Sequence, residues 1–582
     1  MLDAVLAFGM TPVWPFIIGA LLVAAVPSHM ARRVVCVLVP LVALGLVFNA
    51  PNGSYATVSL AGLDLTMMRV DALSRLFALA FCAAGVMAAV YAWHLTKPSQ
   101  QVATLLYSGA AVGAVLAGDF ITLFIYWEIT ALASVFLIWG RITEGAFNTG
   151  MRYLGYQIGS GVLLIGGIAL LYRETGSIDF GTVGTGSWSD WSIGVWLVFA
   201  ALGIKAAFPF VHCWLKDAYP AATVSGTVVL SIFTTKMAIY CLIRGFSGAE
   251  ILVIIGPVMA LYPLIFAEVE DDLRRALSYT LISQLGIMVT GIGVGSGLAI
   301  NGAAAHAVAS IFYQGLLFMV VGAVLYRTGT AQASALGGLW RTMPVTAILC
   351  LVGSASIASV PLFSGFVSKS MTVDATAQSP HFWAWSAIVL ASVGAFINAG
   401  IKVPYRLFFG TDSGHPSTQK GPAEAPHWMI VAMVMAALAC LALGLLPGAF
   451  YAALPVAADY KAYTVSHFIS QGQLLIPVFL VWWFMNRAGL WVTTRPGTVL
   501  DVDWIFRRFL TAVLYFIDRF FTATFSELKR GWAWLISLLA QSLAALYGPE
   551  GPAARLQPTG TMVLWLAILL GVALGLNLID RA

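Results

Sequence analysis

The chain has 582 residues, of which 60% are hydrophobic and only 9% are charged, and its formal net charge is +5. Soluble globular domains carry about 25% charged residues, so this composition excludes that class and indicates a polytopic membrane protein. The small positive charge is dispersed and forms no basic patch of the kind that binds nucleic acid. The six cysteines form no CxxC pair, and GxGxxG, Walker and HExxH motifs are absent, so we expect no cofactor and no metal.

Apolar stretches long enough to cross about 30 Å of hydrocarbon recur along the chain. We therefore expect an all-α polytopic membrane protein with about 14–16 transmembrane helices, the first of which is a true span and not a cleaved signal. Between two spans, the alternating residues 49–69 and their Asn-Gly pair predict a short exposed hairpin. The candidate spans are 13–28, 34–48, 70–93, 101–117, 119–139, 150–172, 193–211, 223–243, 249–267, 276–293, 302–326, 343–363, 380–410, 427–447, 467–485 and 560–579.

Basic residues follow alternate spans near the N-terminus, whereas residues 49–68 contain no Lys or Arg. By the positive-inside rule, the N-terminus is then outside. The basic residues concerned are Arg32, Arg33, Lys97, Arg141 and Arg152.

Four charges stand alone within apolar segments, namely Glu128, Lys205, Lys236 and Lys402. A charge at the bilayer centre costs about 2.5–3.5 kcal/mol on insertion scales, so these residues predict a polar path that carries protons or cations. Glu128 and a lysine can instead form a static ion pair, and Lys205 can snorkel from the end of its span. His306 titrates near neutral pH and suits a proton shuttle, although hydrogen bonds alone can also hold a histidine in an apolar helix.

Three apolar segments contain an internal proline: Pro209, Pro361 and Pro404. Proline removes the hydrogen bond to the carbonyl four residues back, so Pro209 frees the carbonyl of Lys205 and Pro361 frees that of Ile357. Broken helices at membrane depth occur where protein or water satisfies the backbone, and they mark ion sites in transporters. We expect such breaks here, with simple packing kinks as the alternative.

Polar residues near these segments have two interpretations. His212 and Asp217 follow Pro209 and either line the gap of a broken helix or cap the next one. The charged run 268–275 predicts a solvated loop whose charges cap the following helix, with an ion entry funnel as the alternative.

Residues 503–547 mix charged residues with Trp, Phe, Leu and Tyr. Arg508, Arg519 and Arg530 are spaced by eleven residues (519−508 and 530−519), close to three helical turns. This pattern predicts an amphipathic helix that lies along the membrane or along a partner.

Four stretches of the chain read as motifs, namely DFITLFIYWEI (119–129), KAAFPFVHCWLKDAYPAATVSG (205–226), DDLRRALSYTLISQLG (271–286) and PLFSGFVSK (361–369). Together these motifs resemble the antiporter-like subunits of respiratory complex I and of Mrp-type cation/proton antiporters, over roughly residues 60–510. Within the Mrp branch the C-terminal stretches are most similar to the D-type subunit.

This resemblance implies two inverted five-helix repeats, each with a broken helix, around a polar axis along which protons move. Glu128 and Lys205 would form the first half-channel pair, Lys236 the central connection and Lys402 the exit-side lysine. The implied domains are the N-terminal helices with their hairpin (1–100), the first repeat (101–267), the second repeat (268–447), a peripheral helix (448–500), the amphipathic lateral helix (501–550) and a last transmembrane helix (551–582).

One segment departs from the family pattern. The second histidine position of the motif that begins at His306 is Ser310, and the usual lysine position is Gln314. Glutamine can orient water but carries no charge, so we expect a second half-channel that is altered, selective for something else or partly inactive.

We therefore expect a multi-pass subunit of a complex in the bacterial inner membrane. Its partners would be other membrane subunits, the lipid bilayer, protons and Na+ or another monovalent cation, and no nucleic acid. The leading function is Mrp-type cation/proton antiport. The alternatives are a proton-conducting subunit of a redox-driven or CO2/bicarbonate-uptake complex, and a scaffold that conducts nothing.

Overall fold

The computed structural model describes residues 11–60, 62–411, 421–457, 459–491, 497, 499, 501–552 and 559–579. The chain divides into two compact units, residues 1–499 and residues 500–582. Within the described residues, twelve helices are long and apolar enough to cross a membrane, and four shorter apolar helices accompany them. The predicted fold class, an all-helical polytopic membrane protein, is confirmed.

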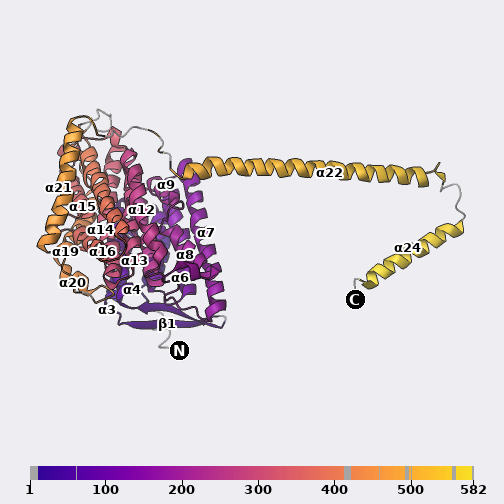
Figure 1. Cartoon of the computed structure of the whole chain (residues 1–582), viewed down its shortest axis with the longest axis horizontal. Helices are drawn as coiled ribbons and strands as arrows, with labels where there is room; N and C mark the ends of the chain where they lie inside the picture. The colour runs from indigo at the N-terminus through magenta and orange to yellow at the C-terminus, as the bar shows by residue number, and fades with distance from the viewer. Residues whose placement is uncertain are drawn as a thin grey trace. The chain divides into compact units, whose positions relative to one another are not determined.

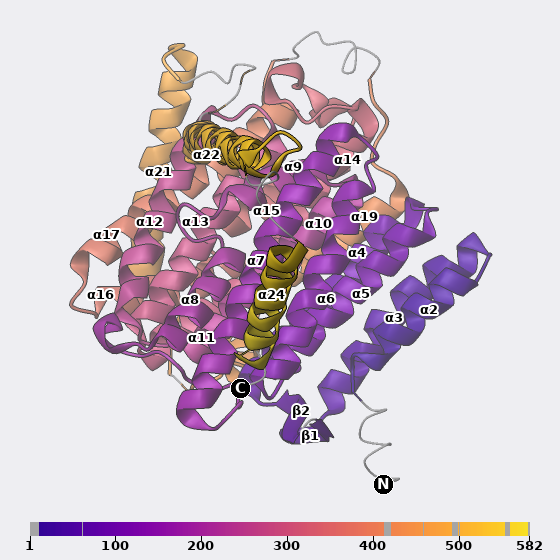
Figure 2. The same cartoon turned by 90° about the vertical axis from the view of Figure 1, so that its right-hand side faces the viewer.

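The first unit begins with an outer helical pair and a β-hairpin. α2 (Trp14–Ala25) and α3 (His29–Asn49) lie together at one side of the helical bundle (Figure 2). β1 (Gly53–Leu60) and β2 (Leu63–Val70) form an antiparallel ladder across one end of the bundle, which we call the hairpin end (Figure 1). The Asn-Gly pair on which the hairpin prediction rested does not form the turn: Asn52 precedes β1 and Gly53 is its first residue. The strands reverse between Leu60 and Leu63.

The long helices of this unit follow in chain order, and short 3-10 turns connect some of them. The 3-10 turns are η1 (Ala92–His94), η2 (Trp188–Asp190), η3 (Ala333–Ala335) and η4 (Leu339–Arg341). The helices up to the middle of the chain are α4 (Ala72–Tyr91), α5 (Pro98–Leu116), α6 (Phe120–Trp139), α7 (Glu144–Thr175), α8 (Ile193–Lys205), α9 (Cys213–Ala221), α10 (Val224–Ile232), α11 (Thr234–Gly245) and α12 (Glu250–Val269).

The second half of this unit contains two π-helical segments, η5 (Phe396–Lys402) and η6 (Tyr405–Phe409), which continue the path of α17. The α-helices here are α13 (Leu273–Val294), α14 (Gly297–Thr328), α15 (Pro344–Ile357), α16 (Ser364–Ala377), α17 (Phe382–Ala395), α19 (His427–Leu445), α20 (Pro447–Ala452) and α21 (Val465–Arg487).

The core of the bundle is formed by α10, α11, α13 and α14, which are buried along almost their whole length. α12 packs so closely on α13 that a Cβ atom at Gly286 would lie 2.3 Å from the backbone nitrogen of Ala260. Only glycine permits this approach, because no packed Cβ atom comes so near to a backbone atom. The central helices are therefore tightly packed and shield the groups between them from lipid.

Asp119 attaches the hairpin to the bundle. Its carboxylate accepts a hydrogen bond from the Thr122 N–H at 2.7 Å, which caps α6, and another from the Thr66 N–H of β2 at 2.7 Å. α6 therefore begins at the hairpin end, as α4 does, and the residues that follow both helices lie at the opposite end. These include Lys97 and Arg141.

A second polar contact at the hairpin end joins α4 to α11. Arg244 Nη2 donates to both carboxylate oxygens of Asp71, at 2.9 and 2.8 Å, and Asp71 also caps α4 by accepting from the Ser74 N–H. Burial acts to raise the pKa of Asp71, but Arg244 and the Ser74 N–H outweigh burial and hold this pKa below its usual value.

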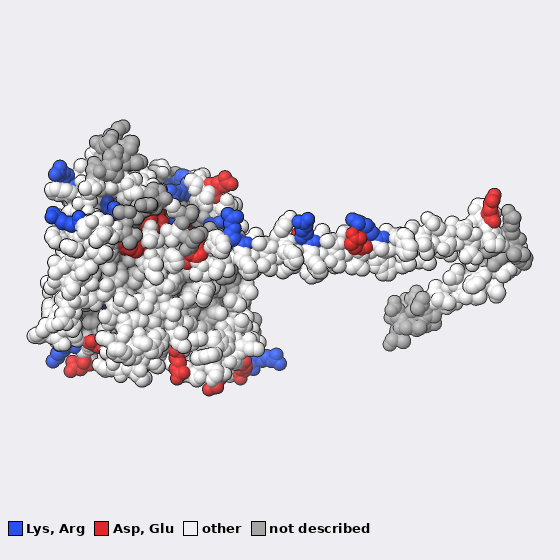
Figure 3. All heavy atoms as spheres, turned by 45° about the horizontal axis from the view of Figure 1, so that its top comes forward, with Lys and Arg blue, Asp and Glu red and all other residues white. Residues whose placement is uncertain are grey.

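Charged side chains on the visible face of the first unit gather at its two ends, and an uncharged belt lies between them (Figure 3). A belt of this kind matches the hydrocarbon region of a bilayer, in which exposed charges are costly. Many large apolar side chains in the bundle's outer helices are exposed, as expected for residues that face lipid.

The charged run 268–275 is not the solvated loop that we predicted. Glu270, Asp271 and Arg274 are buried, with at most 5% of each residue exposed. Asp271 accepts hydrogen bonds from the Ser334 N–H and hydroxyl, and Asp272 caps α13 as expected. The charges are buried because neighbouring loops supply them with partners.

The second unit contains η7 (Ile505–Leu510), α22 (Thr511–Tyr547) and α24 (Thr559–Ile579). α22 has no buried residue, and its charged side chains lie along one edge while the rest of its visible surface is uncharged (Figure 3). At 1.5 Å per residue, α22 is about 55 Å long. It has the amphipathic character that the sequence predicted.

Candidate functional site

Two membrane crossings are broken in the same way. Between α8 and α9, Ala207 and Phe210 adopt positive φ angles of 63° and 70° on either side of Pro209. Between α15 and α16 the same arrangement recurs 152 residues later (359−207, 361−209 and 362−210), at Ser359, Pro361 and Leu362. Positive φ is costly for these residue types, so both breaks are specific features of the fold.

The helices around the two breaks follow the same spacing. α14 begins and ends 153 residues after α7 (297−144 and 328−175). The set α5 to α11 and the set α12 to η5 therefore correspond in chain order. α5 runs toward the hairpin end, since Gly118 donates to Thr66 of β2, whereas α12 starts at the loops of that end. The two sets run in opposite directions through the bundle.

Lys205 is the last residue of α8 and is completely buried at the first break. Its ammonium donates to the Trp127 carbonyl at 2.8 Å and to the Thr130 hydroxyl at 2.8 Å, and it lies 4.0 Å from the centre of the Trp127 ring. Snorkelling is therefore wrong for Lys205, because the side chain points into the bundle and reaches α6.

Glu128 lies next to Trp127 on α6 and is half-buried. It is close enough to Lys205 for an electrostatic interaction, but among the described residues no ion pair joins the two. Its Oε1 atom points at Gly161 of α7 and has no hydrogen-bond partner in the described part of the chain. A Cβ atom at Gly161 would lie 1.6 Å from Oε1, so this glycine makes the space that the carboxylate occupies.

Lys236 lies beside a third interruption, at Phe233 between α10 and α11. Its ammonium donates to the Ser231 carbonyl at 2.7 Å, and the side chain is completely buried. The Tyr107 hydroxyl of α5 fills the same interruption by bonding to the backbone N–H and hydroxyl of Thr234. The expected span over 223–243 corresponds to a single apolar span, Val224–Gly245, that this one-residue interruption divides into two helices.

His306 is the centre of a buried polar cluster in the second half. Its Nδ1 lies 3.1 Å from the Ser368 hydroxyl, and its Nε2 lies 3.2 Å from Gln284 Oε1 and 3.3 Å from the Tyr313 hydroxyl. Both Lys236 and Lys369 lie within electrostatic range of this ring. His306 therefore lies near a lysine of each half.

Lys369 of α16 was not among the residues that we predicted, although its motif was. It is 3% exposed, and its ammonium donates to the Ile357 carbonyl at 3.0 Å. Ile357 is the residue whose carbonyl Pro361 leaves free, so the lysine satisfies the broken end of α15. The signal that identified the other lysines, a lone charge in an apolar segment, also applies to this residue.

The second set of helices does not copy the charges of the first. By the spacings above, the position of Lys205 corresponds to Ile357 and that of Glu128 corresponds to Leu281. Gly161 corresponds to Gln314, whose side-chain N–H donates to the Leu277 carbonyl at 3.0 Å and whose Oε1 has no partner in the described part of the chain. The second half instead contains the buried His306 cluster and Lys369.

Lys402 ends η5 at the opposite end of the bundle from the hairpin. Its ammonium donates to the carbonyls of Ala267, Glu268 and Glu270 at 2.7, 2.6 and 2.8 Å. These carbonyls belong to the C-terminal end of α12, where helices present unpaired acceptors. Lys402 thus closes α12. Pro404 lies two residues later, between η5 and η6.

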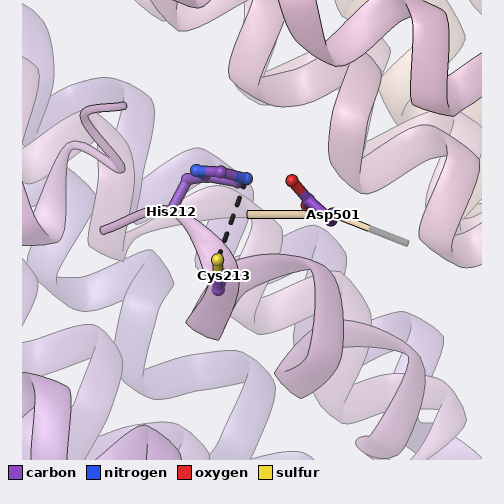
Figure 4. Close-up of side chains that lie close together, drawn as sticks. All are labelled: His212, Cys213 and Asp501. Carbon is purple, nitrogen blue, oxygen red and sulfur yellow. Dashed lines mark hydrogen bonds between the residues drawn. The ribbon is translucent and has the colours of Figure 1, made fainter. Parts of the chain in front are cut away.

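The accessory residues lie apart from this axis. His212 and Cys213 are adjacent at the start of α9, with Sγ 4.0 Å from Nε2 (Figure 4), and the His212 ring packs on Tyr262. Asp217 faces Arg152 at 3.9 Å. The Ser310 hydroxyl donates to a carbonyl of its own helix, α14.

Comparison with known proteins gives a consistent picture. Residues 117–395 match the family described as NADH:quinone oxidoreductase/Mrp antiporter, TM. The A/B subunit of a probable K(+)/H(+) antiporter of Rhizobium meliloti is 32% identical over 66% of this chain and 40% of its own length. The A-type subunit of a Na(+)/H(+) antiporter of Alkalihalophilus pseudofirmus is 30% identical over 71% of this chain and 57% of its own length. Hydrogenase-4 component B of Escherichia coli is 28% identical over 67% of this chain and 62% of its own length.

This chain thus spans about half the length of the curated relatives that it matches. The two antiporter relatives are named as A-type or A/B subunits, whereas the sequence motifs suggested the D-type subunit.

Solved structures share the fold. A chain of the Mrp complex from Dietzia sp. aligns with a TM-score of 0.67 at 20% identity, over 83% of this chain and 99% of that one. A chain of an archaeal membrane-bound sulfane sulfur reductase aligns with a TM-score of 0.69 at 21% identity, over 97% of this chain and 99% of that one. A chain of respiratory complex I from Thermus thermophilus aligns with a TM-score of 0.64 at 20% identity, over 75% of this chain and 97% of that one.

Proposed function

Through residues 117–395 this chain belongs to the membrane family shared by NADH:quinone oxidoreductase and Mrp antiporters, and on that basis we propose that it is an ion-translocating subunit of a multi-subunit complex. Its activity is antiport of protons against Na+ or another monovalent cation. Its partners are other membrane subunits, and its location is the bacterial inner membrane with the hairpin end outside. Two relatives with at least 30% identity, those of Rhizobium meliloti and Alkalihalophilus pseudofirmus, are named as antiporter subunits, which supports this choice.

The observation that carries the proposal is how three of the buried lysines, those beside interruptions of the helices, are held. Lys205, Lys236 and Lys369 each donate to a neutral carbonyl or hydroxyl, and no carboxylate lies in hydrogen-bond contact with them among the described residues. A buried lysine kept for structure is normally paired with an acid, because an unpaired buried charge is costly. A neutral amine can still donate to a carbonyl, so each lysine can lose its proton and keep its hydrogen bond.

These groups form a sequence of sites across the bundle. Glu128 and Lys205 serve the first half, Lys236 joins the halves, and His306 passes protons to Lys369. Water bridges the gaps, and the partnerless buried amide atoms of Gln157 and Gln314 favour this, because buried polar atoms need partners. Lys402, whose ammonium likewise donates to carbonyls, is the exit-side lysine of this path, and the same contacts close α12.

A second candidate is the proton-conducting subunit of a redox-driven complex. Hydrogenase-4 component B favours it, because this chain covers 62% of that protein, more than of either antiporter relative.

The test is proton flux in everted vesicles that contain the complete complex, with the native chain, Lys205→Ala or Lys97→Ala. Lys97 is the matched control, because it is an exposed lysine in a loop. Flux that depends on added Na+ or K+, is lost in Lys205→Ala and is kept in Lys97→Ala supports antiport. Flux that needs an electron donor instead of a cation supports the second candidate. Unchanged flux in an assembled Lys205→Ala complex contradicts both.

A further inference from the structure

A cavity of about 590 Å³ lies between α16, α17 and α21, away from the Glu128 half of the bundle. Its wall includes Ser359 at the helix break and Lys369. It also includes Asp374 of α16 and His467 of α21, each near the hairpin end of its helix. At 1.5 Å per residue, Asp374 lies about 7.5 Å along α16 from Lys369. The cavity therefore extends from a buried lysine toward the hairpin end.

Where the cavity meets α21, its lining is polar near the start of the helix and apolar farther along, at Leu474, Pro477 and Val478. His467, Ser470, Gln471 and Gln473 of α21 all contribute to the wall. The Gln471 side chain donates to the Ala358 carbonyl at 3.0 Å, which ties this face of α21 to the helix break. Apolar residues of α21 outside the wall are exposed, among them Phe468, Ile469 and Phe484. Polar groups of α21 therefore line the part of the cavity nearest the hairpin end, where they offer hydrogen-bond partners to water.

Asp374 and His467 share one proton. His467 Nδ1 lies 2.8 Å from the Ala462 carbonyl, which can only accept, so Nδ1 carries a hydrogen. Nε2 lies 2.9 Å from Asp374 Oδ2, and this contact needs a second proton on one of the two atoms. The pair is therefore either imidazolium with carboxylate or imidazole with carboxylic acid.

The surroundings of the pair keep it accessible and oriented. The side chains of His467 and Asp374 are 22% and 29% exposed. The Tyr460 hydroxyl donates to Asp374 Oδ2 at 2.6 Å, and Tyr451 packs on the Tyr460 ring. Burial, and then the bond to Asp374, raise the pKa of Tyr460, so this phenol stays protonated and acts as a donor. Among the described residues, the titratable groups named here that lie around the pair are Tyr460, Tyr451 and Lys369.

We propose that this cavity is an aqueous proton port that connects Lys369 to the solution at the hairpin end, with the Asp374–His467 pair as its proton-exchanging group. A proton leaves the Lys369 ammonium and passes through water to the pair, and the pair releases its own proton to the solution. The same steps in reverse order carry a proton from the solution to Lys369. The role of the port in transport rests on the proposed function, but the presence of water in the cavity does not.

Cysteine accessibility tests the port without measuring transport. Ser370→Cys and Ser470→Cys place thiols in the cavity wall of the assembled complex, whereas Thr376→Cys is buried outside this wall and Ile476→Cys faces lipid. Ser54→Cys in the exposed hairpin serves as the positive control. The six native cysteines are all buried and set the background. The probe is a charged, membrane-impermeant methanethiosulfonate.

We expect the reagent to label Ser54→Cys, Ser370→Cys and Ser470→Cys from the same side, and to leave Thr376→Cys and Ile476→Cys unmodified. If Ser54→Cys reacts while both cavity cysteines do not, the port is overturned. This result is independent of whether Lys205→Ala abolishes flux, so failure of the port and failure of the proposed function are distinguishable.

Flux then tests the pair. Asp374→Asn keeps the shape but cannot hold the shared proton as an acid, and Asp190→Asn is the matched control because Asp190 is exposed. We expect flux to fall by about a hundredfold in Asp374→Asn alone, the lower end of what a positioned proton-transfer group contributes. Labelling of Ser370→Cys should persist in this background. Normal flux in Asp374→Asn overturns the role of the pair.

Discussion

Replacing Gly161 by alanine moves the Glu128 carboxylate without removing it. The added Cβ atom would lie 1.6 Å from Oε1, and carbon and oxygen need about 3.5 Å, so Oε1 must move by about 1.9 Å (3.5−1.6). The carboxylate is the flexible end of its side chain, so the fold can absorb this movement. Alanine in place of a helical glycine itself stabilises by about 0.5–1 kcal/mol. We therefore expect an assembled complex of normal or slightly raised thermal stability.

Proton flux should nevertheless fall by about a hundredfold, because a misplacement of 1 Å in a reacting group can cost that much. The control is Gly159→Ala in the same helix, where no atom lies within 4 Å of the added Cβ. The assay is cation-dependent proton flux in vesicles, alongside thermal unfolding of the purified complex. Glu128→Gln should lower flux equally, and Gly161→Ala should add nothing to it. Equal flux in Gly161→Ala and Gly159→Ala would refute the role of Glu128.

Substitutions at three further positions test polar contacts of the bundle. Lys236→Met should abolish flux and lower the free energy of unfolding by about 1–3 kcal/mol, because the Ser231 carbonyl loses its donor; a thermal scan showing no change would contradict this. Asp71→Asn should destabilise by about 1 kcal/mol at neutral pH, since the contact with Arg244 is partly screened by solvent. The pKa of Asp71 is lowered in the folded state, so its contribution is present above the unfolded pKa of about 3.9 and is lost as pH falls through the folded pKa; unfolding of both proteins at pH 7 and pH 3 measures it. Lys402→Ala should destabilise by about 1–3 kcal/mol while Lys402→Arg keeps most of the stability, and equal melting temperatures would exclude a role in closing α12.

Much of the fold follows from local features of the chain. Hydropathy alone identifies an all-helical membrane protein, because a span needs only enough consecutive apolar residues. The interruptions around Pro209 and Pro361 are also local, since proline lacks the N–H that the helix needs and fixes where the carbonyl is freed. The break at Phe233 has no such signal. It exists because Tyr107 and Lys236 satisfy the backbone there, and these contacts arise only on folding.

The order of residues is enough to predict that charges lie inside the membrane, because the apolar residues on both sides of a lone lysine or glutamate place it within the span. What each charge contacts is set by the packing of the folded chain. Lys205 reaches α6, Lys369 reaches back to Ile357, and His467 meets Asp374 across about 90 residues (467−374). Which groups meet depends on how distant helices pack, and neither hydropathy nor helical period encodes that packing.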